Sequence, residues 1–314
     1  MPPARPLAAL LALFWLLTPS LRAQPTAPAQ TVSGTFQVFW GDPPTPHEPP
    51  VTLFVLLGDD GSMTPLQAAE SALERFGVQD APRAAAAAPA APESKPFISI
   101  LCKFADSADS VPAPPAHFEA LMGAAYPGVN HYWTEVSEGR VNLNGSRVVG
   151  WYTLPQPRSY YVGSGSQSAD LGKLASDCTA AADSVVHFPD YFGINLQFNQ
   201  RLDCCSWGGG RIMTLDGVTR RYAMTWEASW AAFALGTWVH EVGHALGLPH
   251  SGGPYGRVYD SRWDVMSSSS WFRPPGQSVG FGTHTVTYHK DLLGWVPGAR
   301  KFVAAAPLST LTLE

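Results

Sequence analysis

The chain has 314 residues, of which 45% are hydrophobic, 11% aromatic and 14% charged. This apolar content is too high for a chain that is disordered throughout, and the length suits one large domain or two smaller ones. Twenty lysines and arginines stand against 25 aspartates and glutamates, which gives a formal net charge of −5. Because binding to nucleic acid needs a basic face, this balance argues against nucleic acid as a partner.

The first 23 residues have the pattern of a signal peptide. Arg5 precedes an unbroken apolar run from Leu7 to Leu17, and small residues lead on to Ala23. This run is too short to cross a bilayer, which takes about 20 residues, but it suits the apolar region of a signal peptide. A buried N-terminal helix is the alternative, and the Pro-rich flanks disfavour it. We expect cleavage after Ala23 and a secreted, extracellular protein without stable membrane insertion.

Residues 24–80 are predicted to form a small β-rich unit that could serve as a propeptide. Thr35–Trp40 and Val51–Leu57 have β-type composition, and Asp59-Asp60-Gly61 is a turn signal. Residues 81–96 are rich in Ala and Pro without apolar periodicity, which predicts a linker of the kind where proteolysis concentrates. We expect the N-terminal unit to be dispensable or inhibitory. No cysteine precedes Cys102, so inhibition through a free thiol is not expected.

A mixed pattern of helices and strands begins after the linker and predicts a catalytic domain over residues 97–298. Residues 299–314 would then be a C-terminal strand or the start of a truncated further domain. The predicted elements are a buried strand at Phe97–Phe104, helices at Ala116–Ala125 and Tyr132–Glu138, a strand pair around Asn144-Gly145 within Val141–Tyr152, a hairpin across Asp216-Gly217, and a helix from about Trp226 to Leu246.

The four cysteines fit an oxidising compartment. Cys178, Cys204 and Cys205 lie in polar, loop-like sequence, whereas Cys102 lies inside an apolar run. Sequence alone does not choose among the three full pairings. We favour one disulfide from Cys178 to Cys204 or Cys205, with Cys102 as a buried thiol.

The segment from His240 to His250 carries the clearest chemical signal in the chain. On a helix, residues four apart share a face, so His240 and His244 can both direct a ring nitrogen at one Zn²⁺. Glu241 can reach the water that the metal activates. Gly247 can end the helix in a left-handed conformation, which lets His250 return as a third ligand. The sequence therefore predicts one catalytic zinc on three histidines, with Glu241 as general base.

This pattern, H-E-x-x-H-x-x-G-x-x-H, resembles the motif of the metzincin metallopeptidases. The resemblance implies a methionine-containing turn beneath the zinc, and Met266 in the segment Tyr259–Ser267 would supply it by packing rather than by ligation. Some metzincins have a tyrosine ligand two residues after that methionine. Ser268 stands there in this chain, so no fifth protein ligand is expected.

Among metzincins the chain is most similar to the secreted immune inhibitor A-like and gametolysin-like peptidases. The similar pieces are Tyr132–Gly139, Gly150–Pro155 and Tyr288–Trp295. The resemblance implies an α+β fold in which a twisted mixed sheet packs on helices, including the zinc-binding helix. It also implies hydrolysis of protein or peptide substrates, with Ca²⁺ as a further compatible ion. We expect the protein to be a monomer.

Two other functions compete with a zinc endopeptidase. One is a secreted, non-catalytic binding module that keeps the zinc helix as a structural relic, and Glu241 argues against it because a structural site needs no general base. The other is a zinc hydrolase of non-peptide amides or esters, which the sequence barely separates from a peptidase. The remaining histidines without ligand spacing are expected to be structural: His131, His187, His284 and His289.

Overall fold

The structure is a computed structural model that describes residues 35–44, 48–58, 63–66, 92–165, 167–252, 259–268 and 281–301. The predicted signal peptide, the turn at 59–61, most of the linker and residues 302–314 lie outside these ranges. Across the part of the chain that is described, no helix is long and apolar enough to cross a membrane.

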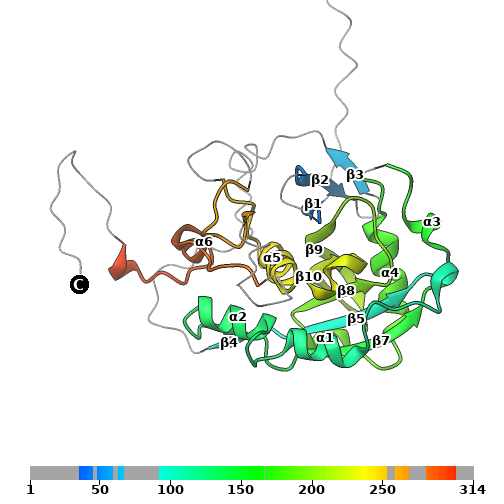
Figure 1. The fold of residues 1–314 in the computed structure, drawn as a ribbon, viewed down its shortest axis with the longest axis horizontal. Coiled ribbons are helices and arrows are strands. Elements are labelled where there is room, and N and C mark those ends of the chain that lie inside the picture. The colour runs from blue at the N-terminus through cyan, green and yellow to red at the C-terminus, as the bar shows by residue number, and fades with distance from the viewer. Residues whose placement is uncertain are drawn as a thin grey trace, which may run out of the picture. The chain divides into compact units, whose positions relative to one another are not determined.

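One eight-stranded mixed sheet contains strands from both sides of the predicted linker (Figure 1). Its spatial order is β3-β2-β1-β9-β10-β8-β5-β7. The bounds are β1 Thr35–Asp42, β2 Val51–Leu57, β3 Met63–Leu66, β5 Phe97–Lys103, β7 Arg147–Thr153, β8 Gly193–Phe198, β9 Ser206–Leu215 and β10 Val218–Glu227. Strands β7, β5, β8 and β10 are parallel, whereas β9, β1, β2 and β3 each run antiparallel to the preceding neighbour.

Helices cover both faces of this sheet, so the molecule has the mixed α+β class that the sequence predicts. Their bounds are α1 Pro115–Met122, α2 Val129–Val136, α3 Arg158–Tyr161, α4 Leu171–Ala182, α5 Leu235–Ala245 and α6 Thr287–Leu292. One core cluster joins the sheet to α4, and a second joins it to α1, α2 and α5. The inner strands β5 and β8 are buried along nearly their whole length because both faces are covered.

Strand β1 lies inside the sheet, between β2 and β9. Its Phe39 is fully buried and meets the Trp226 ring edge-on at 5.6 Å between centroids. On the opposite face, Val38 and Trp40 form a smaller cluster with Phe54 of β2. The strands that precede the linker thus extend the sheet of the region that follows it, and β1 contributes to the main core.

The segment before α5 departs from the sequence prediction. Trp226 is not helical: it belongs to β10, which continues to Glu227, and a 3-10 helix at Ser229–Phe233 separates it from α5. Pairing of β10 with both β8 and β9 outweighs the helix-like pattern of its residues, because a central strand buries apolar side chains on both faces. The hairpin across Asp216-Gly217 is confirmed.

The predicted strand pair around Asn144-Gly145 is also wrong. Val141–Asn142 forms the short strand β6, which pairs in parallel with β4 (Glu93–Ser94), inside the predicted linker. Strand β7 instead pairs in parallel with β5. The Asn-Gly turn therefore passes the chain from one sheet to another, a tertiary choice that local sequence does not reveal.

The disulfides differ from the expected pairing. Cys102 on β5 is bonded to Cys178 on α4, with the two Cα atoms 6.3 Å apart, and the neighbours Cys204 and Cys205 are bonded to each other. Cys178 lies on the buried face of α4, which packs on β5, so its nearest thiol is in the strand. The bridge from Cys178 to Cys204 or Cys205, with a free Cys102, is therefore a wrong prediction.

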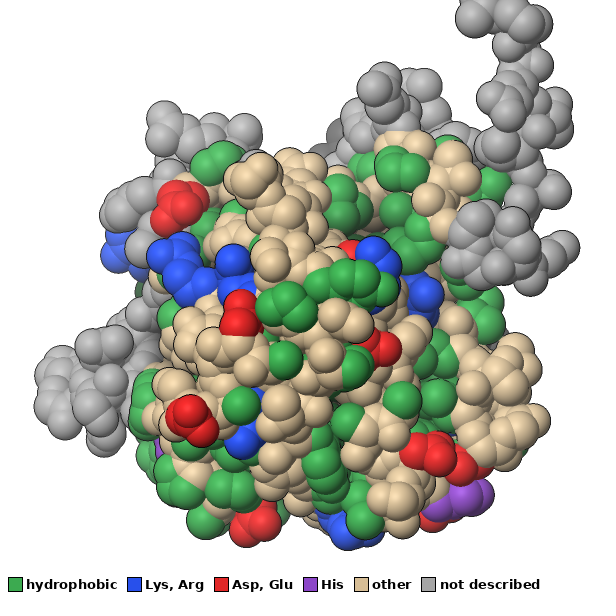
Figure 2. Space-filling model, turned by 90° about the vertical axis from the view of Figure 1, so that its right-hand side faces the viewer, with side chains coloured by type: hydrophobic (Ala, Val, Ile, Leu, Met, Phe, Trp, Pro, Cys, Tyr) green, Lys and Arg blue, Asp and Glu red, His purple; other side chains and the backbone are tan. Residues whose placement is uncertain are grey.

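The surface shown in Figure 2 carries acidic, basic and apolar side chains in an interspersed pattern. Lysines and arginines do not gather into one dominant patch on this face. This distribution agrees with the low charge content of the sequence.

Candidate metal centre

Helix α5 and the turn that follows it bring the three predicted histidines together. His240 and His244 lie one turn apart, with ring centroids separated by 4.7 Å. The helix ends at Ala245, and Gly247 has a φ of +99°, a left-handed conformation that glycine adopts readily. The reversed chain returns His250 to a position where its ring centroid is 4.5 Å from that of His244.

Backbone carbonyls fix the rings on α5. The Nδ1 atom of His240 lies 2.6 Å from the Val265 carbonyl oxygen, and Nδ1 of His244 lies 2.6 Å from the Leu248 carbonyl oxygen. A carbonyl oxygen only accepts hydrogen bonds, so each Nδ1 carries the proton and each Nε2 is left as a lone-pair donor. Burial also lowers the pKa of His244 to about 3, which keeps this ring neutral.

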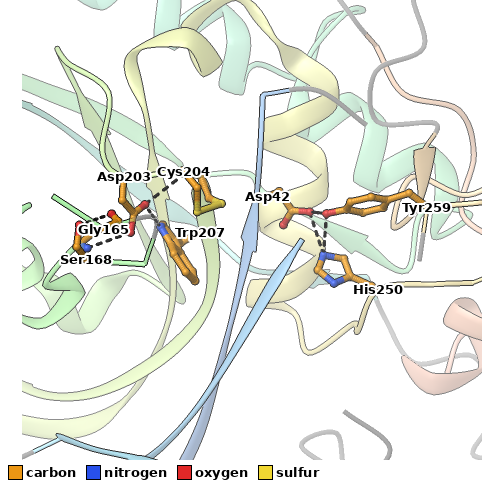
Figure 3. Close-up of a disulfide and its surroundings, with 10 residues drawn as sticks. Asp42, Gly165, Ser168, Asp203, Cys204, Trp207, His250 and Tyr259 are labelled. Carbon is orange, nitrogen blue, oxygen red and sulfur yellow. Dashed lines mark hydrogen bonds and ion pairs between the residues drawn. A yellow bond between two sulfur atoms is a disulfide. The ribbon is translucent and has the colours of Figure 1, made fainter. Parts of the chain in front are cut away.

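A fourth side chain, Asp42 at the end of β1, enters the same space (Figure 3). Its Oδ1 lies 3.1 Å from His240 Nε2 and 2.9 Å from His250 Nε2, and its Oδ2 lies 3.3 Å from His244 Nε2. Burial opposes ionisation of Asp42, but attraction to His240 and His250 outweighs it and lowers the pKa of Asp42 well below its usual value. The four ligand atoms lie within 4.8 Å of one another.

This donor set fits a metal ion. Three imidazole nitrogens and one carboxylate oxygen are ligands that Zn²⁺ accepts in tetrahedral geometry. The group of Asp42, His240, His244 and His250 could therefore hold a metal ion.

Tyr259 completes the contacts of Asp42. Its hydroxyl donates a hydrogen bond to Asp42 Oδ1 and lies 3.3 Å from His250 Nε2 (Figure 3). Its ring meets the His250 ring edge-on at 5.1 Å, and its φ is +64°, a left-handed conformation that is uncommon outside glycine. The hydroxyl of Ser268, two residues after Met266, donates a hydrogen bond to the Ser261 carbonyl oxygen. The sequence analysis found neither Asp42 nor Tyr259, because no motif marks them.

Two buried glutamates lie near the histidines. Glu241 on α5 is fully buried, and its pKa is raised well above the usual value by burial and then by the charges of Asp42 and Glu227. Glu227, at the end of β10, is also fully buried, and burial is the main cause that raises its pKa to about 8. The charge of Asp42 thus disfavours ionisation of both buried glutamates.

Met266 lies beneath α5, as the sequence predicts for a packing residue. A Cβ atom on Gly243 would lie only 2.4 Å from the Met266 sulfur, so the thioether occupies the space that a side chain at 243 would need. The turn around Met266 is tied down by Asp264, which accepts the Met266 N–H at 3.2 Å and pairs with His289 of α6 at 2.9 Å. This turn also holds the Val265 carbonyl against His240.

No protein-family model matches the chain, and no curated protein matches it. The class of the molecule therefore rests on its own geometry. The fold and the site define an α+β protein with a buried group of three histidines and one aspartate that could bind a metal ion.

Proposed function

We propose that the chain is a secreted zinc-dependent endopeptidase of metzincin type. The observation that carries this proposal is the convergence of three histidine Nε2 atoms beside the buried carboxyl of Glu241. A site that only stabilises the fold gains nothing from a buried glutamate one residue after its first ligand. Export is supported by the pattern of residues 1–23 and by the two disulfides, which persist in oxidising compartments.

The histidines would hold the metal, and Glu241 would move the proton. A zinc ion bound by His240, His244 and His250 would polarise the scissile carbonyl and lower the pKa of the attacking water. Glu241 would accept a proton from that water and deliver it to the leaving amine. The carbonyls of Val265 and Leu248 would keep the two helix histidines oriented throughout.

The proposal includes latency, because Asp42 occupies the place that the water and the substrate need. Three histidines leave a fourth tetrahedral position open, as in catalytic zinc sites, whereas three histidines and an aspartate close it. Asp42 belongs to the segment before the predicted linker, so cleavage within residues 81–91 would allow β1 to leave. The N-terminal unit would then be inhibitory, through a carboxylate rather than a thiol.

A structural zinc site is the alternative that one observation favours, since four protein ligands are typical of such sites. It would require Asp42 to remain in place permanently. Hydrolysis of non-peptide esters or amides has no observation of its own in its favour. Among the described residues, the group around Asp42 is the only cluster of side chains that could hold a metal ion, so no Ca²⁺ ligands are assigned.

The test uses full-length chains that carry the recognition site of a specific protease within residues 84–90. The wild type and the variants are cut at this site after folding, and their zinc content and activity are compared. We expect about one zinc per chain, and casein hydrolysis that a chelator abolishes. Glu241→Gln should keep the zinc and lose about 10²–10⁴ in rate, because glutamine cannot accept the proton. Glu119→Gln, at an exposed position of α1, is the matched control.

Each outcome separates the candidates. Hydrolysis that persists at the wild-type rate in Glu241→Gln, or that ignores the chelator, would reject the mechanism. Zinc retention without hydrolysis of casein would favour the structural site, and cleavage of simple esters alone would favour the non-peptide hydrolase.

A further inference from the structure

Strands β1 and β9 fit together through two complementary pairs of large and small residues. In their antiparallel register, Trp40 lies opposite Gly208, and Gly41 lies opposite Trp207. Side chains directly opposite each other point to the same face of a sheet. Each tryptophan thus lies against a position with no side chain, one pair on the α5 face and one on the opposite face.

The first pair covers the metal site. The Trp40 ring stacks on the His244 ring at 4.9 Å between centroids, with only 6° between the planes. Gly208 has no room for a side chain, since a Cβ atom there would lie 2.6 Å from the Glu241 carbonyl oxygen and from His244 Cβ. Strand β9 therefore lies directly on α5, and the strand that pairs with β9 brings Trp40 over one face of the His244 ring.

The second pair excludes a side chain from the neighbouring position. A Cβ atom on Gly41 would lie 2.5–2.8 Å from three atoms of the Trp207 ring. That ring is buried, and its Nε1 donates to Asp203 Oδ1 at 3.0 Å. Asp203 also accepts the Cys205 N–H at 3.3 Å, beside the Cys204–Cys205 disulfide (Figure 3). Because the Trp207 side chain is buried and its Nε1 is hydrogen-bonded, the ring cannot easily turn aside for a larger residue.

We propose that the edge of β9 is a peptide-binding groove that selects an aromatic residue followed by glycine, and that β1 is its resident occupant. This inference rests on the proposed function and names its substrate class. An extended peptide would add to β9 as an antiparallel strand, held by main-chain hydrogen bonds, with specificity from the side-chain positions. Because Asp42 follows Gly41 and lies at the metal, the aromatic–glycine pair belongs on the N-terminal side of the scissile bond.

Tryptophan should be the preferred aromatic residue at the first position. The imidazole of a metal-bound histidine is electron-poor, and the indole ring is the aromatic group that attracts positive charge most strongly. Tyrosine and phenylalanine would follow, and alanine would leave the His244 ring uncovered. At the second position, any side chain would meet Trp207.

The first experiment measures binding rather than turnover. The protein is the full-length chain cut within residues 84–90 after folding and then separated from the released N-terminal fragment, because β1 otherwise occupies the groove. The probe is a fluorescent synthetic peptide of residues 35–44, and its binding is followed by fluorescence anisotropy. Replacing the tryptophan of the peptide by alanine, or the first glycine by alanine, should weaken binding by at least about tenfold. The loss caused by the glycine replacement should persist in chelator-treated protein, because the contact with Trp207 does not involve the metal.

Phe36→Ala in the peptide is the matched control, since Phe36 stacks on Phe54 of β2. It should change the affinity by less than about twofold. Asp42→Asn in the peptide should weaken binding only when zinc is present. Equal affinity of the Trp40→Ala and Phe36→Ala peptides would overturn the proposal.

The second experiment sequences the products of a random peptide library digested by the same cut protein. We expect aromatic–glycine pairs to be enriched within the three residues before the scissile bond. Cleavage without that enrichment would reject the groove specificity while leaving the proposed peptidase intact. Selective binding of the peptide without any cleavage would do the opposite, because it would keep the groove and remove the catalytic function.

Discussion

The metal site consists of two halves that the fold holds in different ways. His240 and His244 are anchored from behind by the carbonyls of Val265 and Leu248, in a helix that is buried along its whole length. The carboxylate of Asp42 instead contacts the three histidines and Tyr259. Under the proposed function, the histidines of α5 are a fixed half that would bind the metal, and Asp42 is a removable half that would close the site.

His244→Ala should have the largest effect, because it removes a ligand from the fixed half. Loss of one imidazole should lower zinc affinity by several orders of magnitude and abolish activity, and some stability should go with it, since metal binding free energy is partly folding free energy. Elemental analysis and thermal unfolding measure both effects. His187→Ala, at an exposed position, is the control. Full zinc retention in His244→Ala would contradict the ligand assignment.

Asp42→Ala should have the next largest effect, and it should open the site rather than remove the metal. Zinc should remain on the three histidines, while the fourth position becomes open to a small chelating probe. We expect acetohydroxamate to bind the full-length Asp42→Ala chain at least about tenfold more tightly than the wild type, as measured by calorimetry. Asp109→Ala, on the surface, should behave like the wild type. Loss of zinc in Asp42→Ala would make the aspartate a structural ligand.

Glu227→Gln tests the electrostatics of the fixed half. Glu227 has a pKa of about 8 in the folded protein against an ordinary value of 4.5. Between these values the unfolded chain has lost the proton and the folded chain has kept it, so the free energy of unfolding of the wild type falls as the pH rises, by up to about 1.4 kcal/mol per pH unit. The advantage of Glu227→Gln over the wild type should therefore grow from pH 5 to pH 8. Denaturant unfolding at both pH values measures it, and a constant difference would contradict the raised pKa.

Tyr259→Phe should have the smallest effect, confined to the removable half. It deletes one hydrogen bond to Asp42 and keeps the ring against His250. Binding of acetohydroxamate to the full-length chain should strengthen by about tenfold, because a hydrogen bond to a charged group contributes roughly 1.5 kcal/mol at the lower end of its range. Tyr288→Phe, exposed on α6, is the matched control. Weaker binding of acetohydroxamate would indicate instead that the Tyr259 hydroxyl contacts the probe in the open site.

The two halves also differ in how far the sequence predicts them. The spacing of His240, His244, Gly247 and His250 is local, and the helix together with its terminal turn converts it into three converging rings. Asp42 lies 208 positions before His250, and an Asp at the end of a strand has no distinguishing pattern. The pairing of β1 with β9 that brings Asp42 to the site is a long-range contact, which neither composition nor periodicity specifies.

The same division holds for the fold. The turn Asp216-Gly217 joins adjacent strands, and its hairpin is confirmed. Trp226 was predicted to be helical because its surroundings are apolar, but central strands and buried helices have the same composition over short runs. The pairing of Cys102 with Cys178 depends on α4 packing over β5, which only the tertiary structure determines.

The interior position of β1 has a consequence for how the protein must be made. Phe39 fills part of the main core and pairs with Gly209, so a long loop has to close before β9 has its neighbour, and such non-local pairing is slow to form. A chain synthesised without residues 24–91 would have to assemble around an open edge and an unfilled cavity beside Trp226. A chain cut after folding starts from the completed core and is retained by its unfolding barrier. The order of synthesis and cleavage, more than the final set of residues, would then decide whether active protein is obtained.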